Sequence, residues 1–329
     1  MNKIRKIVLG LSIFAMVIAG CAPKSNSDVK EPVSLGFAPS LNYLAITALE
    51  QGYFADEGLE VTVTEYSTGT KALNGLFDGE VDVSVVGTGP LVTASFDRSD
   101  FKIFSSVSTH YDLYRIVARK DSGIQTPSGL KGKRVGTSQG SSFHYFLHNF
   151  TLENGFSEDD VELVFSGAAD QPAALANGDV DAISTREPYI SEAISLLGEN
   201  YIIFSEPGLP SNTLNLIAMD TYLQEKPQVA EKMLRALLRA EEFASQNSSQ
   251  ALSLVAGYLD ISEEELQVGW ENTTLSVSLN QELILELENI ARWSIGQGLT
   301  DASNIPNYLD YFYLDGLDTV KPEAIAIIR

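Results

Sequence analysis

The sequence of this chain repeats one short pattern, and the repeat predicts two similar units. Residues 76–82 read LFDGEVD and residues 175–181 read LANGDVD, at an offset of 99 positions. Each segment ends a helical pattern, turns at a glycine, enters an apolar stretch and then reaches a loop with a proline. The pattern fits a common helix–glycine–strand junction, and it also fits one equivalent unit in each of two α/β lobes. Ligands of open α/β sheets bind at the carboxyl ends of strands, so the two loops would then face one cleft.

Strand and helix patterns alternate along the chain, which favours an α/β fold with mixed, mostly parallel sheets flanked by helices. Strand patterns cover residues 32–37, 59–65, 81–86, 101–108, 114–118, 133–136, 161–165 and 180–184. Helix patterns cover residues 41–51, 70–77, 140–154 and 171–176, and then 226–246, 249–258, 262–270 and 280–295.

The composition is that of a globular protein with an acidic surface. The 329 residues, of which 44% are hydrophobic and 20% charged, are enough for about two domains with cores of their own. The 44 Asp and Glu residues outnumber the 22 Lys and Arg residues, for a formal net charge of -22. Such a charge excludes broad binding to nucleic acid and docking on anionic lipid headgroups.

The N-terminus predicts export and a lipid anchor. Three basic residues precede the apolar run IVLGLSIFAMVIAG, which is shorter than a typical membrane span. The run ends in IAGC, which resembles a bacterial lipobox, and Cys21 is the only cysteine of the chain. We therefore expect a lipoprotein signal peptide at residues 1–20, lipidation of Cys21 and a polar tether at 21–32; the alternative is an ordinary signal peptide. Loss of Lys3, Arg5 and Lys6 takes the net charge from -22 to -25.

Several segments together resemble the nitrate/sulfonate/taurine group of periplasmic binding proteins, which serve ABC importers. The resemblance spans about residues 33–245 and is carried by LAITALEQGYFADEGLEV (44–61), GEVD (79–82), LKGKRVG (130–136), GSSFHYFL (140–147), GDVDA (178–182) and EPY (187–189). It implies a two-lobed periplasmic-binding-protein clamp of type II, with lobe one at residues 33–117 plus 221–329 and lobe two at 118–220. It further implies an extracytoplasmic, membrane-anchored monomer without cofactor or metal. Its partners would be a small-molecule solute and an ABC permease with its ATPase subunits.

The best candidate for ligand contact is the glycine turn that opens the helix pattern after residue 140. Free backbone N–H groups and the positive end of the helix dipole suit an anionic oxygen, and Ser138, Ser141 and Ser142 add hydroxyl groups nearby. Ser141 could instead only cap the helix.

Loops of the first lobe supply further candidates. Thr88 and Gly89 offer a hydroxyl and a close backbone approach, or they form only a tight turn. Ser40, Asn42 and Tyr43 follow the first strand, Thr68 follows the second, and Tyr111 follows a later one. Tyr43 could form a stacking wall or pack in the core.

Arg186 departs from the family pattern, which has an aromatic residue before the acid-Pro-Tyr run. A guanidinium in the cleft would bind a carboxylate or sulfonate in bidentate fashion, or Arg186 could pair with Glu187 or another acid. Glu187 could instead accept a hydrogen bond from a ligand amine, which keeps a zwitterionic solute open.

The leading prediction is a binding protein for a small anionic or zwitterionic organic solute that resembles a sulfonate, taurine or nitrate. The alternatives are a binding protein for a neutral heterocycle, such as a pyrimidine precursor of thiamine, and a solute-sensing receptor subunit. An enzyme is not expected, because the predicted export signal and the single cysteine, which is the predicted lipid site, count against a cysteine-dependent intracellular enzyme. His144 and His148 lie four residues apart, but no third metal ligand has a telling spacing.

Overall fold

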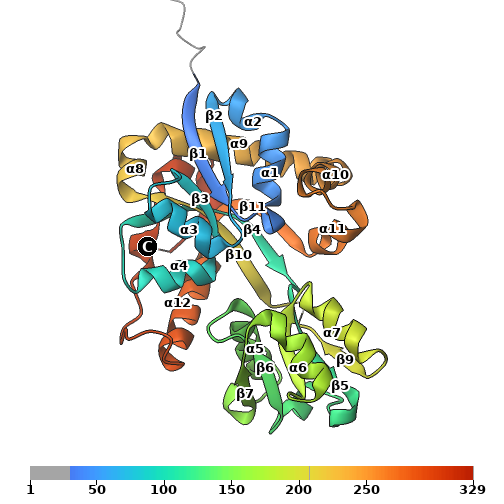
Figure 1. The fold of residues 1–329 in the computed structure, drawn as a ribbon. Helices are drawn as coiled ribbons and strands as arrows, with labels where there is room; N and C mark the ends of the chain where they lie inside the picture. The colour runs from blue at the N-terminus through green and yellow to red at the C-terminus, as the bar shows by residue number, and fades with distance from the viewer. Residues whose placement is uncertain (1–29, 207, 329) are drawn as a thin grey trace, which may run out of the picture.

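The computed structural model describes residues 30–206 and 208–328, which form two lobes, each built on its own sheet (Figure 1). The predicted signal peptide, Cys21 and the predicted tether as far as residue 29 lie outside the described residues. Within the described part of the chain, no helix is long and apolar enough to cross a membrane.

The larger lobe contains a 7-stranded sheet in the order β12–β11–β4–β10–β3–β1–β2. Strand β1 pairs in parallel with β2 and β3, whereas β10 runs antiparallel between β3 and β4. The strands are β1 (Glu31–Phe37), β2 (Leu59–Glu65), β3 (Val83–Gly87), β4 (Phe101–Tyr111), β10 (Pro210–Met219), β11 (Thr273–Asn280) and β12 (Ile325–Ala326).

The smaller lobe contains a 5-stranded sheet in the order β7–β6–β8–β5–β9. Strand β6 pairs in parallel with β7 and β8, and β5 runs antiparallel between β8 and β9. The strands are β5 (Tyr114–Arg119), β6 (Arg134–Thr137), β7 (Glu162–Phe165), β8 (Ala182–Arg186) and β9 (Tyr201–Phe204).

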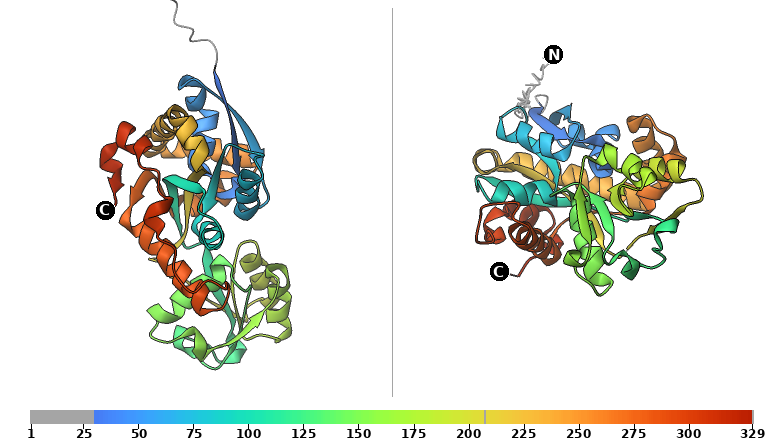
Figure 2. Two further views of the ribbon diagram at one scale, coloured as in Figure 1. Left: turned by 90° about the vertical axis from the view of Figure 1, so that its left-hand side faces the viewer. Right: turned by 60° about the horizontal axis from the view of Figure 1, so that its bottom comes forward.

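Helices flank both sheets, as Figures 1 and 2 show. Those of the smaller lobe are α5 (Ser142–Glu153), α6 (Gln171–Asn177) and α7 (Tyr189–Leu197). Those of the larger lobe are α1 (Tyr43–Glu50), α2 (Tyr53–Asp56), α3 (Gly69–Phe77), α4 (Thr88–Ser95), α8 (Asp220–Glu225), α9 (Pro227–Gln246), α10 (Ser248–Leu259), α11 (Glu263–Glu271), α12 (Gln281–Gly296) and α13 (Asp315–Val320). Short 3-10 turns are η1 (Pro39–Leu41), η2 (Lys120–Ser122), η3 (Pro127–Leu130), η4 (Glu158–Asp160), η5 (Ala168–Asp170), η6 (Tyr308–Tyr311) and η7 (Pro322–Ala324).

The expected α/β fold with two lobes is confirmed, and two details of the prediction change. Each sheet is mixed, as expected, but half of its strand pairs rather than most are parallel, because the strands next to the crossovers, β5 and β10, run antiparallel to their neighbours. The chain crosses between the lobes after β4 and again after β9. The expected boundaries at 117/118 and 220/221 therefore lie one strand too late, since β5 belongs to the smaller sheet and β10 to the larger.

The two faces of the smaller sheet carry separate cores. Ile116 and Ala118 of β5 pack in one cluster, beneath α5, and Val117 between them packs in the other, against α6 and α7. This alternation follows from the two-residue period of a strand, whose side chains point to opposite faces. The sheet is thus covered on both faces and leaves its strand ends free to border the cleft.

The repeated pattern of the sequence marks equivalent units in the two lobes. Gly79 follows α3 with φ of 74°, and Gly178 follows α6 with φ of 80°, so both helices end in the left-handed conformation that glycine favours. The aspartate three residues after each glycine then anchors a neighbouring strand. Asp82 accepts a hydrogen bond from the Ser34 N–H at 2.8 Å, and Asp181 accepts one from the Arg134 N–H at 3.0 Å.

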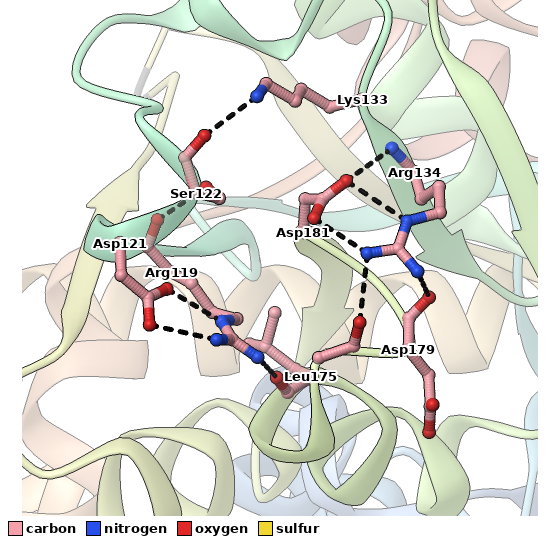
Figure 3. A network of polar contacts seen from close by, with 9 residues as sticks. Arg119, Asp121, Ser122, Lys133, Arg134, Leu175, Asp179 and Asp181 are labelled. Atoms are coloured by element: carbon pink, nitrogen blue, oxygen red, sulfur yellow. Dashed lines mark hydrogen bonds and ion pairs between the residues drawn. The ribbon is translucent and has the colours of Figure 1, made fainter.

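The unit in the smaller lobe carries additional ion pairs (Figure 3). The Arg134 side chain pairs with Asp181 at 2.9 Å and donates to the carbonyl of Asp179. Arg119 pairs with Asp121 and also reaches the carbonyl of Leu175. These arginines link the turn after α6 to the last residue of β5 and the first residue of β6. They therefore support β8, the strand that leads from this turn to the cleft.

Helix α12 of the larger lobe reaches the smaller lobe (Figure 2). Its Trp293 packs edge-on against His144 of α5, with ring centroids 4.9 Å apart. Just past its end, the Gln297 side chain donates to Glu158 at 3.1 Å. The lobes therefore touch through α12 and α5 as well as through the two crossovers.

Glu158 lies at the centre of this lobe contact. The carboxylate is 3% exposed and lies 2.9 Å from His144 Nε2 and 3.3 Å from His148 Nδ1. His144 Nδ1 accepts the Gly140 N–H, which places the His144 proton on Nε2, facing Glu158. Burial favours the neutral acid, but the hydrogen bonds from His144 and His148 outweigh it and lower the pKa of Glu158 to about 2.

We expect Glu158→Gln to destabilise the protein at pH 7 by on the order of 3 kcal/mol, because the folded state lowers the pKa of this carboxyl from 4.5 to about 2. A depressed pKa gives stability that is complete above pH 4.5 and is lost as the pH falls towards 2. Urea unfolding from pH 7 to pH 3 measures this, and the difference between wild type and variant should shrink below pH 4.5. The exposed neighbour Asp159 is the control, and Asp159→Asn should stay within about 0.5 kcal/mol of wild type. A difference that is constant with pH would contradict the assignment.

Candidate functional site

A cleft of about 1380 Å³ lies where the strands of both sheets end. Its lining includes Gly87 to Pro90, which follow β3, and Arg186 and Glu187, which follow β8. The two loops of the repeated pattern therefore face one cleft, as the sequence predicts. This is the place where open α/β sheets bind their ligands.

All but two of the predicted ligand-binding residues line this cleft. Those that do are Ser40, Asn42, Thr68, Thr88, Gly89, Tyr111, Ser141, Ser142, Arg186 and Glu187. Tyr43 does not, because it is 3% exposed and stacks on Trp270 with ring centroids 5.6 Å apart. Ser138 does not either, since its hydroxyl donates to the carbonyl of Ser166 at 2.7 Å. Contact with a ligand stays a prediction for the residues that do line the cleft.

The N-terminus of α5 has fewer free donors than the sequence suggests. Ser141 caps the helix: its hydroxyl accepts the His144 N–H at 3.2 Å and donates to the carbonyl of Ser138 at 2.7 Å. The backbone N–H of Ser141 also donates to that carbonyl. Within the described residues, the N–H groups of Ser142 and Phe143 have no such partner and lie at the positive end of the helix.

The N-terminus of α4 meets the N-terminus of α5 across the cleft. A Cβ placed on Gly89 would lie 3.7 Å from Ser142 Oγ, so the two turns are in van der Waals range. Thr88 begins α4, and its hydroxyl is used within the protein, as a donor to Glu286 at 2.6 Å. Two helix dipoles of the same sign therefore point into one region, which favours a negative group between them.

Arg186 adds a full positive charge to the cleft. Its side chain is exposed, and in the described structure no carboxylate pairs with it, whereas the lining residues Arg98 and Arg115 pair with Asp100 and Asp112. The predicted alternative of an ion pair with Glu187 is therefore not found; Glu187 instead accepts the Ser191 N–H of α7 at 3.2 Å.

Glu286 of α12 is the functional candidate that the sequence analysis missed. It lines the cleft and accepts hydrogen bonds from the hydroxyls of Thr88, at 2.6 Å, and Thr213, at 2.8 Å. Burial raises the pKa of Glu286 above its ordinary value, although both hydrogen bonds act in the opposite direction. One signal could have revealed it: Glu286 lies on the apolar face of its helix, three residues after Leu283 and four before Ile290.

The three histidines of the chain lie outside the cleft lining. His110 is fully buried between Ser108 and Thr273, and burial lowers its pKa to about 4. His144 and His148 both face Glu158. Within the described residues, no group of three or more His, Cys, Asp or Glu side chains is placed to hold a metal ion.

Two lobes, two crossovers and a cleft between strand ends define the periplasmic-binding-protein fold. The chain belongs to the NMT1/THI5-like family, which residues 43–251 match. A putative aliphatic sulfonates-binding protein of Bacillus subtilis is 29% identical over 276 residues, which cover 81% of this chain and 82% of that protein.

Solved structures confirm the fold. The periplasmic aliphatic sulphonate binding protein SsuA from Escherichia coli aligns with a TM-score of 0.71 at 19% identity and covers 88% of this chain and 98% of its own. The desulfurization enzyme DSZB aligns with a TM-score of 0.64 at 17% identity, over 89% of this chain and 99% of its own. Because an enzyme shares the fold, the fold alone does not decide the activity.

Gly87 allows Asn212 to approach the turn into α4, and we expect Gly87→Ala to destabilise the protein by about 1–2 kcal/mol. The backbone of Gly87 has φ of -70°, which suits alanine, but the added Cβ would collide with Asn212 Oδ1. Urea unfolding measures the cost. In an Asn212→Ala background the collision is gone, and the same change should be neutral or slightly stabilising. An equal loss of unfolding free energy in the wild-type and Asn212→Ala backgrounds would contradict the proposed collision.

Proposed function

We propose that this protein is the extracytoplasmic solute-binding component of an ABC importer, and that it captures a small organic anion of the sulfonate type in the cleft by lobe closure. The observation that carries the proposal is the meeting of two helix N-termini and the unpaired Arg186 in one cleft of a protein with a net charge of -22. Unpaired backbone N–H groups at the start of α5 and the unpaired guanidinium of Arg186 favour an anionic group of the ligand in this cleft.

The relatives support the same solute class and the same location. The Bacillus subtilis protein and the Escherichia coli structure are both described as binding aliphatic sulfonates, and the latter is periplasmic. A sulfonate presents three oxygens, which suit the free N–H groups at the start of α5 and a bidentate guanidinium. A binding role rather than catalysis agrees with the placement of all three histidines away from the cleft lining.

The remaining parts of the proposal are the anchor and the transporter. Lipidation of Cys21 would hold the protein at the outer face of the cell membrane, as a monomer on its tether. The closed lobes would then present their cleft-side surfaces to the permease, which works with its ATPase subunits.

We expect a bound sulfonate to stabilise the purified protein against thermal unfolding, by about 2.7 kcal/mol when its concentration is 100 times Kd. A thermal-shift series with alkanesulfonates, nitrate, carboxylates and neutral pyrimidines tests the solute class. A shift with the pyrimidines alone would support the thiamine-precursor alternative and contradict the proposal.

Arg186→Ala should weaken binding of a sulfonate by about 10- to 100-fold, because a charge-assisted hydrogen-bond pair of roughly 1.5–3 kcal/mol is lost. Calorimetric titration measures the change. Arg98→Ala is the matched control: it removes one positive charge from the same cleft, but one already paired with Asp100 at 2.8 Å. If both variants weaken binding equally, long-range charge and not contact by Arg186 explains the affinity.

Cys21→Ser should prevent lipidation and release the protein from the membrane, because the thiol is the acyl acceptor of a lipobox. Fractionation of cells that express the full chain, with a labelled fatty acid, measures both effects. Wild type should carry the label in the membrane fraction. A wild-type protein that is exported without the label would favour the ordinary signal peptide.

A further inference from the structure

The contact between α5 and α12 covers only one end of each helix. Trp293, near the end of α12, packs against Tyr145 at the start of α5 with ring centroids 5.1 Å apart, in addition to its contact with His144. Gln297, just past α12, adds the hydrogen bond to Glu158. The end of α12 therefore meets the start of α5, and each helix continues away from the contact in its own lobe.

Beyond this contact, one face of each helix lines the cleft. Spacings of three and four residues place side chains on one face of a helix. The two faces consist of residues 145, 149 and 152 on α5 and residues 282, 285, 289 and 293 on α12, all in the cleft lining. Two continuous helix faces, one from each lobe, therefore border the same cleft and share one contact.

Leu152 and Leu285 are the leucines of these two faces, and both are exposed. Leu152 is 54% exposed and Leu285 is 50% exposed. Given the rise of an α-helix, Leu152 lies about 10 Å along α5 from Tyr145, and Leu285 lies about 12 Å along α12 from Trp293. Because the two distances match, a rotation of the lobes about the contact brings the leucines together and removes both from water.

Two carboxylates lie at the outer end of these faces. Glu153 follows Leu152, and Glu282 lies three residues before Leu285; both acids are exposed and line the cleft. Within the described residues, neither acid has an ion-pair partner. The same rotation brings the two like charges towards each other, so their repulsion opposes lobe closure while burial of the leucines favours it.

We propose that α5 and α12 form a closing seam, in which Leu152 packs on Leu285 when the lobes close and repulsion between Glu153 and Glu282 opposes closure. The seam is continuous with the contact that Trp293 already makes, so closure aligns two helices that touch at one end. This inference rests on the lobe closure of the proposed function, and it concerns what limits closure rather than which solute drives it.

A pair of cysteines in place of the leucines tests whether the seam forms. Leu152→Cys with Leu285→Cys is made in the full chain with Cys21→Ser, which leaves no other thiol. A disulfide needs Cα atoms within about 7 Å, so under copper–phenanthroline this pair should cross-link about 10-fold faster or more than a pair on faces that do not meet. The control pair is Leu152→Cys with Val268→Cys; Val268 lines the same cleft and is 62% exposed, but it belongs to α11, which lies apart from α12 (Figure 1). Equal rates for the two pairs would overturn the seam.

Charge reversal at the outer end of the seam tests the role of the acids. Glu282→Lys in the double-cysteine chain replaces repulsion of Glu153 by attraction, and cross-linking should accelerate by about 2- to 5-fold, the size expected for an exposed ion pair. Glu264→Lys is the matched control, because it changes the net charge equally on α11 and outside the cleft lining, and it should leave the rate unchanged. Equal acceleration in both variants, or no acceleration in Glu282→Lys, would overturn the role of the acids.

The cross-linking assay needs no solute, so the seam and the solute class fail separately. A thermal-shift series without any response to sulfonates contradicts the solute class, while the cysteine pair still reports on the seam. A sulfonate that stabilises the protein should also raise the cross-linking rate of the Leu152→Cys and Leu285→Cys pair. A bound sulfonate that leaves this rate unchanged would overturn the assignment of the seam to lobe closure.

Discussion

The cleft depends on one arrangement, in which the first turns of α4 and α5 meet across the gap between the lobes. Each helix follows a central strand of its sheet, β3 in the larger lobe and β6 in the smaller. Strand β3 runs parallel to β1, and β6 runs parallel to β7 and β8, so the carboxyl ends of these parallel strands and the helices that follow them lie at one edge of each sheet. Two helix N-termini with unpaired N–H groups at one place favour a negative or polar group beside them.

The net negative charge of the protein affects how an anionic solute reaches this cleft. A body with a net charge of -22 repels an approaching anion over the range of a Debye length, which is about 8 Å at physiological ionic strength. Helix N-termini and Arg186 act only at short range. Capture of an anion therefore depends on short-range contacts with these groups inside the cleft.

Much of this organisation follows from the sequence, because it depends on local rules. Gly79 and Gly178 mark helix ends that need a positive φ, and the acids three residues later anchor a neighbouring strand of the sheet in both lobes. The assignment of β5 and β10 to sheets did not follow, because a strand pattern does not say with which strand it pairs. Side-chain roles were harder still. A serine such as Ser141 can either contact a ligand or cap a helix. Only its hydrogen bonds with His144 and Ser138 show that it caps α5.

Glu286 shows why the site itself was the least predictable part. It is separated from Thr88 by 198 residues in the chain, and no local rule joins them. The same helix also carries Trp293 and is followed directly by Gln297, and these two residues contact the smaller lobe at His144 and Glu158. Positions 286, 293 and 297 recur at the spacing of one helix face, and seven residues of rise separate Glu286 from Trp293 by only about 10 Å. The helix that lines the cleft at Glu286 therefore also carries the side-chain contacts between the lobes, so the cleft wall and the lobe contact share one element.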